Sequence, residues 1–244
     1  MTYELLLYSV IMGDKWRAMW LKGGQMSFEL QLVLVGGIIG ILGAVLGGLV
    51  EALTEDWRAD RRERRRKRQQ DIKTALEWAA TGRKASLRRA DLRGADLRGV
   101  DLGPGEGREE GADLSYADLR GANLAGARLY RASLEGANPQ GATLAGANLQ
   151  RAHLERAKLD GANLVASHLP RAFLFAANLR RAFLSLANLQ EVELAMANLQ
   201  GADLEDANLQ KAILAGANLQ GATLRGAKLE GARADQHTIW PEGF

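Results

Sequence analysis

The sequence contains no cysteine, which excludes disulfide bonds, cysteine-ligated zinc, iron–sulfur clusters and thiol nucleophiles. It has only 4 prolines among 244 residues, and its 3 histidines are too scattered to form a cluster for metal binding or acid–base catalysis. Nucleotide-binding glycine motifs, zinc-protease motifs and a Ser/His/Asp constellation are also missing from the sequence. We therefore predict a protein that is not an enzyme, with no catalytic residues, no metal site and no cofactor.

A strong excess of charge of either sign is missing too. Lys and Arg number 32 against 29 Asp and Glu, and a net charge of +3 is too small to indicate a nucleic-acid-binding protein. Aromatic residues make up only 6% of the chain while glycine reaches 28 residues, a composition unusual for a conventional mixed core. These averages conceal three unlike segments joined end to end.

The first segment ends in a long apolar run. Residues 30–50 contain one polar side chain, Gln31, and no charge. At about 1.5 Å per residue, a helix of this length covers the roughly 30 Å hydrocarbon core of a bilayer. A cleavable signal peptide fits poorly, because the run is too long and no basic region opens the chain. We predict a transmembrane helix at 30–50, preceded by a short extracytoplasmic or interfacial N-terminus at 1–29.

Small residues recur every four positions within this run and form one stripe on a helix. Such stripes let helix backbones approach closely in lipid, although glycine is also simply common in membrane helices. We predict that the stripe packs against a partner helix or a second copy of the chain. Its members are Gly36, Gly40, Ala44 and Gly48.

The charges that flank the run set its orientation. Three basic residues precede it and eight follow it between Arg58 and Arg68. This asymmetry predicts a single-pass protein with the N-terminus outside and the remainder in the cytoplasm.

The second segment, 51–84, reads as a basic helical neck because no glycine or proline interrupts Glu51–Ala80. Its basic cluster either faces anionic lipid or only sets the topology. An amphipathic stretch that includes Ile72, Ala75, Leu76 and Ala79 is predicted to form a lid over the open end of the next segment. The cluster consists of Arg61, Arg62, Arg64, Arg65, Arg66, Lys67 and Arg68.

The third segment is an internal repeat of five residues. Leucine recurs at every fifth position from Leu87 to Leu102, shifts phase by two across the following loop, and then runs from Leu114 to Leu229. Alanine stands two residues before nearly every leucine, and Pro139 replaces one leucine. Self-similarity at a fixed short period is the sequence signature of a repeat architecture.

The period of five excludes a helix. Each leucine would advance by about 140° around a helix, so that no buried face would exist. In extended backbone the alanine and the leucine face one side, the residue between them faces the other, and the remaining two residues turn the chain. A short strand and a turn, repeated, form a β-solenoid whose coils stack about 4.8 Å apart.

Runs such as GADLRGVDL, GANLAGARL and GADLEDANLQKAILAGANLQ resemble the pentapeptide repeat family, over Ala85–Ala234. The resemblance implies a mainly β fold, a right-handed quadrilateral β-helix of about seven coils with four pentapeptides in each. This domain is expected at 85–236 with a loop at 103–111. A C-terminal cap is expected at 237–244, a tail similar to those of bacterial and especially cyanobacterial members.

The outer positions of the solenoid supply the candidate contact residues. Arginines twenty apart line one corner and repel one another unless solvent, Glu155 or an anionic group of a partner lies between them. A small apolar patch shares a face with Ile213, interrupted by Glu193, and stacked asparagines are expected to bond along the ladder. The candidate contact residues are Arg131, Arg151, Arg171, Phe173 and Phe175.

Together these features favour a non-enzymatic, membrane-anchored scaffold for an unidentified protein partner at the cytoplasmic membrane face. One alternative is the regulatory rod of an oligomeric channel or transporter assembly. Another, implied by the resemblance alone, is a DNA mimic that binds DNA gyrase, as some members of the family do. Residues 88–235 hold 18 basic and 18 acidic side chains, which disfavours mimicry of phosphate charge, and no nucleic-acid partner is expected.

Overall fold

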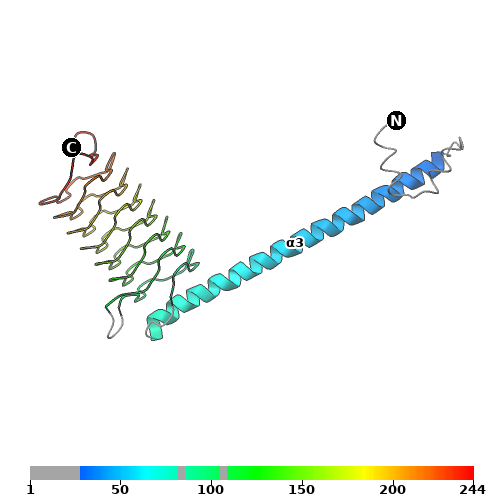
Figure 1. Cartoon of the computed structure of the whole chain (residues 1–244), viewed down its shortest axis with the longest axis horizontal. Helices are drawn as coiled ribbons and strands as arrows, with labels where there is room; N and C mark the ends of the chain where they lie inside the picture. Colours follow the sequence, from blue (N-terminus) through cyan, green and yellow to red (C-terminus); the bar gives the residue numbers. More distant parts are fainter. Residues whose placement is uncertain (1–27, 82–85, 105–108) are drawn as a thin grey trace. The chain divides into compact units, whose positions relative to one another are not determined.

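A computed structural model describes residues 28–81, 86–104 and 109–244. The chain divides into two compact units, Met1–Arg62 and Glu63–Phe244, which are described separately. The described elements are one α-helix, α3, at Phe28–Thr81, and a long series of isolated parallel β-bridges between residues 91 and 239 (Figure 1). The N-terminal region that we predicted at 1–29 lies almost wholly outside the described residues.

The helix α3 is longer than either helix predicted from the sequence. Its 54 residues join the predicted span and the predicted neck without a break, and it ends at Thr81, next to Gly82. Within the part of the chain that the structure describes, no helix is both long enough and apolar enough to cross a membrane. The side chains of the glycine stripe at Gly36, Gly40, Ala44 and Gly48 lie outside the described residues, and so does nearly all of the predicted span.

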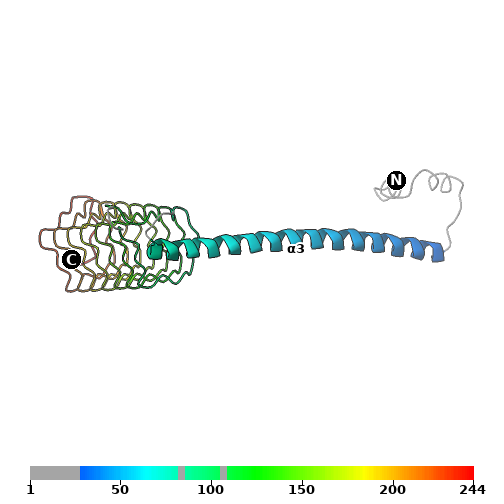
Figure 2. The same cartoon turned by 90° about the horizontal axis from the view of Figure 1, so that it is seen from below.

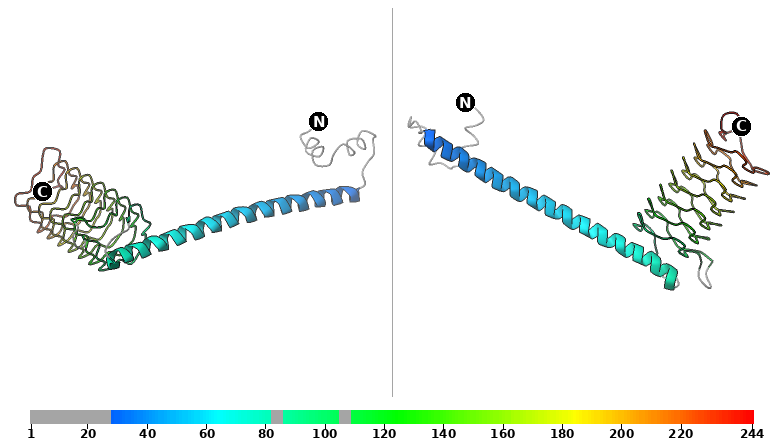
Figure 3. Two further views of the ribbon diagram at one scale, coloured as in Figure 1. Left: turned by 60° about the horizontal axis from the view of Figure 1, so that its bottom comes forward. Right: turned by 180° about the vertical axis from the view of Figure 1, so that it is seen from behind.

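The five-residue period produces coils of twenty residues. Parallel bridges join Ser133 to His153 and His153 to Phe173, and the same spacing of twenty continues along all four faces. The coils follow one another in a regular stack, which can be seen from three further directions (Figures 2 and 3). Each predicted short strand is reduced to a single bridge residue, because two residues in every five are used to turn the chain.

Three backbone N–H groups in each five-residue unit donate to neighbouring coils. Asn178 N donates to Ala157 O of the preceding coil at 2.9 Å, whereas Leu179 N and Arg181 N donate to Asn198 O and Gln200 O of the following coil at 2.7 and 2.9 Å. The turn that follows is closed by Ala182 N, which donates to Leu179 O at 3.1 Å. The third residue of this turn, Arg181, has a positive φ of 54°, a feature of type II turns.

The interior of the rod is filled by the two inward positions of the repeat. Every central leucine from Leu87 to Leu219 is at most 1% exposed, and the alanines two residues earlier line the same core. Ser167, which replaces one alanine, is also buried, and its hydroxyl donates to Leu164 O at 2.6 Å. The buried hydroxyl therefore has a partner, and the substitution leaves the repeat intact.

The coil closes across the position of the predicted loop. Ala112 N donates to Leu102 O at 2.8 Å, so these two residues meet in the turn although nine residues separate them in the sequence. Bridges across this coil, such as Asp91 to Asp118, span twenty-seven residues instead of twenty. A Cβ at Gly111 would lie 2.8 Å from the carbonyl oxygens of Leu102 and Tyr130, so only glycine fits where the loop rejoins the coil.

The two ends of the rod are covered differently. At the first coil, Ala75 of α3 is completely buried, Ile72 packs against the core, and Asp71 Oδ2 accepts a 2.8 Å hydrogen bond from Asp91 N. Leu76, which we also expected in this lid, is 44% exposed because it lies on the outer side of the helix. The side chain of Ala79 lies outside the described residues.

The last coil carries the C-terminal tail. Ile239 pairs with Asn218, and the following Trp240 packs against the core. Phe244 stacks on Trp240 with ring centroids 4.9 Å apart and is itself 65% exposed. Trp240 therefore covers part of the last coil, and Phe244 is held by its ring stack on Trp240 and by a hydrogen bond from its N–H to Pro241 O at 3.3 Å.

Pro139 stands at a buried leucine position and interrupts the ladder at one point. No bridge joins Asn138 to Lys158, although its neighbours on the described rod are all paired, because proline has no N–H to donate. The flanking bonds, Lys158 N to Ala137 O and Gly141 N to Asp160 O, keep lengths of 2.9 and 3.1 Å. One hydrogen bond is therefore lost at Pro139 while the register of the coils is kept, with no local bulge.

We predict that Pro139→Leu stabilises the rod by about 1 kcal/mol or more, because leucine restores one ladder N–H and buries more apolar surface. The free energy of unfolding of the detergent-solubilised chain measures the effect. Pro170→Leu, at a half-buried corner outside the core, is the matched control and is expected to give no comparable gain. A loss of stability in Pro139→Leu would show that the interior there has no room for leucine.

Candidate interaction site

The three predicted arginines do share one corner of the rod, on successive coils. Arg171 Nε donates to Glu191 Oε2 at 2.8 Å, and this hydrogen bond raises the pKa of Arg171 and lowers the pKa of Glu191. Arg131 Nη1 donates to Glu109 O at 2.9 Å and lies over the ring of Tyr130. Two of the three arginines are thus neutralised or held within the chain, rather than left for an anionic partner.

Glu155, one of the three alternatives that we considered for neutralising these arginines, is not their counter-ion. It lies on a different corner, and its Oε1 is 3.1 Å from Nδ1 of His153. The ring of His153 stacks on Phe173 with centroids 4.7 Å apart and 11° between the planes. Phe173 pairs with Glu193, which pairs with Ile213, so the apolar column is interrupted at the expected residue.

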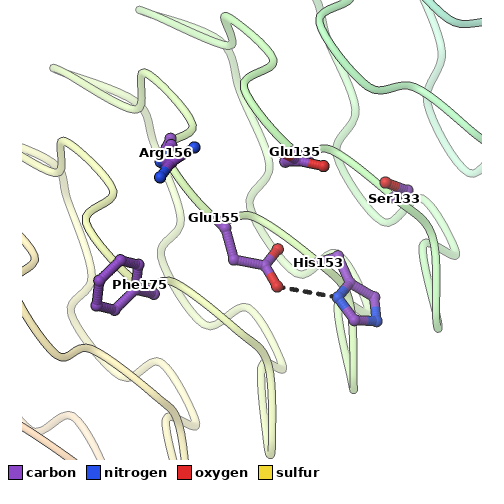
Figure 4. Close-up of a pocket in the computed structure, with 6 residues that line it drawn as sticks. All are labelled: Ser133, Glu135, His153, Glu155, Arg156 and Phe175. Carbon is purple, nitrogen blue, oxygen red and sulfur yellow. Dashed lines mark hydrogen bonds and ion pairs between the residues drawn. The ribbon is translucent and has the colours of Figure 1, made fainter.

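A shallow pocket of about 290 Å³ lies beside this column (Figure 4). Phe175, 39% exposed, contributes to its lining, and Figure 4 shows the carboxylate of Glu155 turned toward His153. The pocket joins one predicted contact residue, Phe175, to charged residues on the two preceding coils. We call it the acidic pocket, and its lining consists of Ser133, Glu135, His153, Glu155, Arg156 and Phe175.

The basic cluster of the neck does not present all its side chains to solvent. Arg61 lies 4.6 Å from the ring centroid of Trp57, and Arg62 Nε donates to Arg58 O at 3.3 Å. Arg68 Nη2 donates to Arg93 O in the first coil, so Arg68 contacts the rod instead of facing lipid as we expected. Arg68 is half-buried, and the other six members lie on the exposed surface of α3: Arg61, Arg62, Arg64, Arg65, Arg66 and Lys67.

The stacked asparagines bond differently from our expectation. Asn198 Oδ1 accepts a hydrogen bond from Gln200 N at 3.1 Å, and Asn208 and Asn218 repeat the same local arrangement. The short amide reaches the turn two residues ahead more easily than the next coil. Along the ladder, Gln200 Nε2 at a corner donates to Gln220 Oε1 at 3.1 Å, and among the asparagines Asn188 Nδ2 lies 3.2 Å from Nδ1 of His168.

Sequence reasoning missed a set of local ion pairs in the first coils. Arg93 donates to both carboxylate oxygens of Asp91 at 2.7 and 2.6 Å, and this bidentate contact is the main reason why the pKa of Asp91 lies below its ordinary value. Asp96 with Arg98, and Asp118 with Arg120, form the same pair. The recurring sequence ADLR, which places an arginine two residues after an aspartate, is the signal from which these ion pairs could have been predicted. Exposed pairs of this kind add little stability.

Two exposed apolar side chains were also missed. Leu186 and Met196 are each 61% exposed and each has a φ of +61°. Glycine occupies the same corner position as Leu186 at Gly126 and Gly146. An exposed apolar residue in a left-handed conformation costs about 1 kcal/mol that glycine avoids, so these positions mark the outer surface as a candidate contact surface.

The arrangement offers surfaces rather than a reaction centre. The described residues contain no group of three or more His, Asp or Glu side chains able to hold a metal ion. A core of buried leucine and alanine, coils of twenty residues and parallel pairing on four faces define a quadrilateral β-solenoid.

The chain belongs to the pentapeptide repeat family. Eight copies of the repeat are matched, over residues 80–103, 110–138, 140–174, 171–206 and 202–236. The fold of this family is the right-handed quadrilateral β-helix, in agreement with the bridging pattern. No curated protein matches the sequence.

Solved structures of other pentapeptide repeat proteins are similar to the chain. A trypsin-treated form of QnrB1, a plasmid-mediated fluoroquinolone resistance protein, is 20% identical, with 62% of this chain and 78% of that chain covered and a TM-score of 0.50. A protein of the Arabidopsis thaliana thylakoid lumen is 29% identical, with 40% and 64% covered and a TM-score of 0.33. Rfr23 of the cyanobacterium Cyanothece is 27% identical, with 69% and 99% covered and a TM-score of 0.26. The likeness to QnrB1 shows the fold alone.

Proposed function

We propose that the protein is a non-enzymatic, membrane-anchored scaffold that presents a rigid rod to protein partners at the cytoplasmic membrane face. The observation that carries the proposal is the filled interior, in which leucine and alanine are buried from Leu87 to Leu219. Because this core is filled, only the outer faces and corners of the rod can contact a ligand or a partner. Exposed side chains there, including Phe175, Phe183 and Met196, suit contact with another protein.

The charge balance supports protein contact over DNA mimicry. The 18 basic and 18 acidic side chains of residues 88–235 cancel, whereas a surface that imitates a nucleic acid needs an excess of negative charge. Ion pairs within the rod, such as Arg171 with Glu191, reduce its outward field further.

The anchor in this proposal is the apolar run at 30–50. Its 21 residues carry no charge, and its backbone is helical as part of α3. Eight basic residues follow it and three precede it, so the rod is proposed to lie on the cytoplasmic side. The exposed arginines of the neck would then lie close to anionic headgroups.

Alkaline carbonate extraction of membranes tests the anchor. We expect the full chain to remain in the membrane pellet, and a variant that lacks residues 30–50 to move to the supernatant. A second variant, with Arg64, Arg65, Arg66 and Lys67 replaced by Gln, is the control for purely electrostatic attachment and is expected to stay in the pellet. Release of the full chain by carbonate would contradict a transmembrane anchor.

A further inference from the structure

The acidic pocket lies at a corner where three successive coils contribute side chains. Gly136 N donates to Glu155 O at 2.9 Å, and Arg156 N donates to Phe175 O at 3.0 Å, so the backbone around the pocket is fixed by ladder bonds. Because each position is set by the coil repeat, the pocket exists before any ligand arrives.

Two carboxylates face the pocket without a permanent counter-ion. Glu135 and Glu155 are equivalent residues of adjacent coils, which stack about 4.8 Å apart. Glu135 accepts a hydrogen bond from the hydroxyl of Tyr116 at 3.2 Å, and Oε1 of Glu155 lies 3.1 Å from Nδ1 of His153. Like charges at this spacing repel, and a cation between them would relieve the repulsion.

One oxygen of Glu155 lacks a hydrogen-bond partner. Its Oε2 is buried and no donor lies within reach, while the side chain as a whole is 29% exposed. A buried acceptor without a donor costs free energy, and the terminal torsion of glutamate turns easily. A donor entering the pocket would satisfy this oxygen with little movement of the chain.

An aromatic face completes the lining. The ring of Phe175 is 39% exposed, and on the next coil the same corner carries Met196, which is 61% exposed. A planar guanidinium can stack flat on an aromatic ring and donate two parallel N–H groups to one carboxylate, whereas an ammonium group is a compact point charge without this planar fork.

We propose that the acidic pocket binds the guanidinium group of an arginine side chain of a partner protein. The inference rests on the proposed function in one respect, namely that the rod acts through protein contact. Arg156 also lines the pocket and opposes a cation there, so it tunes the affinity downward.

The three histidines of the chain allow a site-specific test. The full chain in detergent micelles, with isotope-labelled histidine rings, is titrated at constant pH with the peptide acetyl-Gly-Arg-Gly-amide while ring signals are recorded by NMR. We expect the ring signals of His153 to shift and saturate, and those of His168 and His237 to stay in place. The neutral citrulline peptide is expected to cause no shift, and the lysine peptide to bind more weakly than the arginine peptide.

Single substitutions test whether the shift of the His153 ring signals reports binding in the acidic pocket. Glu155→Gln is expected to weaken binding of the arginine peptide about tenfold, because one charge-assisted contact is lost. Glu205→Gln changes the equivalent residue of another corner and should leave binding unchanged, whereas Arg156→Gln should strengthen it.

Unmoved His153 signals, equal shifts with the citrulline or lysine peptide, or full affinity in Glu155→Gln would each overturn the proposal. If these results appeared while the full chain remained in the carbonate-extracted membrane, the pocket inference would fail and the anchored scaffold would stand.

Discussion

Replacement of Leu199 by alanine is expected to lower the free energy of unfolding by about 2–5 kcal/mol. Leu199 is completely buried in an interior coil, where the coils above and below prevent the site from closing around the cavity. Each coil contacts only its neighbours, so the defect weakens the coupling of the two halves of the solenoid. Denaturant unfolding of the detergent-solubilised chain, followed by circular dichroism, measures the loss.

The matched control is Thr223→Ala, which removes a similar number of atoms from an exposed outward position. Its expected effect is within about 0.5 kcal/mol. Equal melting temperatures of the Leu199→Ala variant and the unmodified chain would mean that the central position of the repeat is not the core position.

The second large effect is expected at the other end of the rod. Ala75→Asp places a carboxylate where α3 packs on the first coil, and a buried charge without a partner costs several kcal/mol. The helix end is expected to detach while the rod stays folded. Hydrogen exchange at residues 87–102 should accelerate at least about tenfold, since Asp91 N would lose its bond to Asp71.

Leu76→Asp is the control, because the neighbouring side chain is 44% exposed on the same helix. It is expected to leave exchange at residues 87–102 unchanged. Equal acceleration in both variants would show that charge on the helix, rather than burial at Ala75, controls the contact.

The architecture of the rod could be predicted from sequence because the signal repeats. Alanine and leucine at fixed positions decide which side of the backbone is buried, and the same choice recurs in every coil. The seven extra residues between Leu102 and Leu114 displace the phase by two, which locates the loop without any structure.

The outer contacts could not be predicted in the same way. An arginine at a corner can pair with an acidic residue two positions earlier, as Arg93 does with Asp91, or on the next coil, as Arg171 does with Glu191. The repeat places both partners within reach, and side-chain rotamers decide between them. The pairing of Glu155 with His153 depends on the same kind of choice.

The length of the strands and the effect of Pro139 on the register could not be predicted from the sequence either. Periodicity indicates extended backbone but not its length, and here the turns leave a single bridge residue on each face. At Pro139 the missing N–H was predictable from the residue type, but the undisturbed register was not, because it depends on the intact bonds at Lys158 and Gly141.

The central claim is that the rod stands on the cytoplasmic side of a membrane, and reporter fusions after Phe244 test it most directly. One fusion carries a reporter that is active only in the cytoplasm, and the other carries one that is active only outside. The eight basic residues that follow the apolar run, against three before it, predict activity of the cytoplasmic reporter alone. Activity of the outside reporter in the unmodified protein would contradict the orientation and the cytoplasmic scaffold.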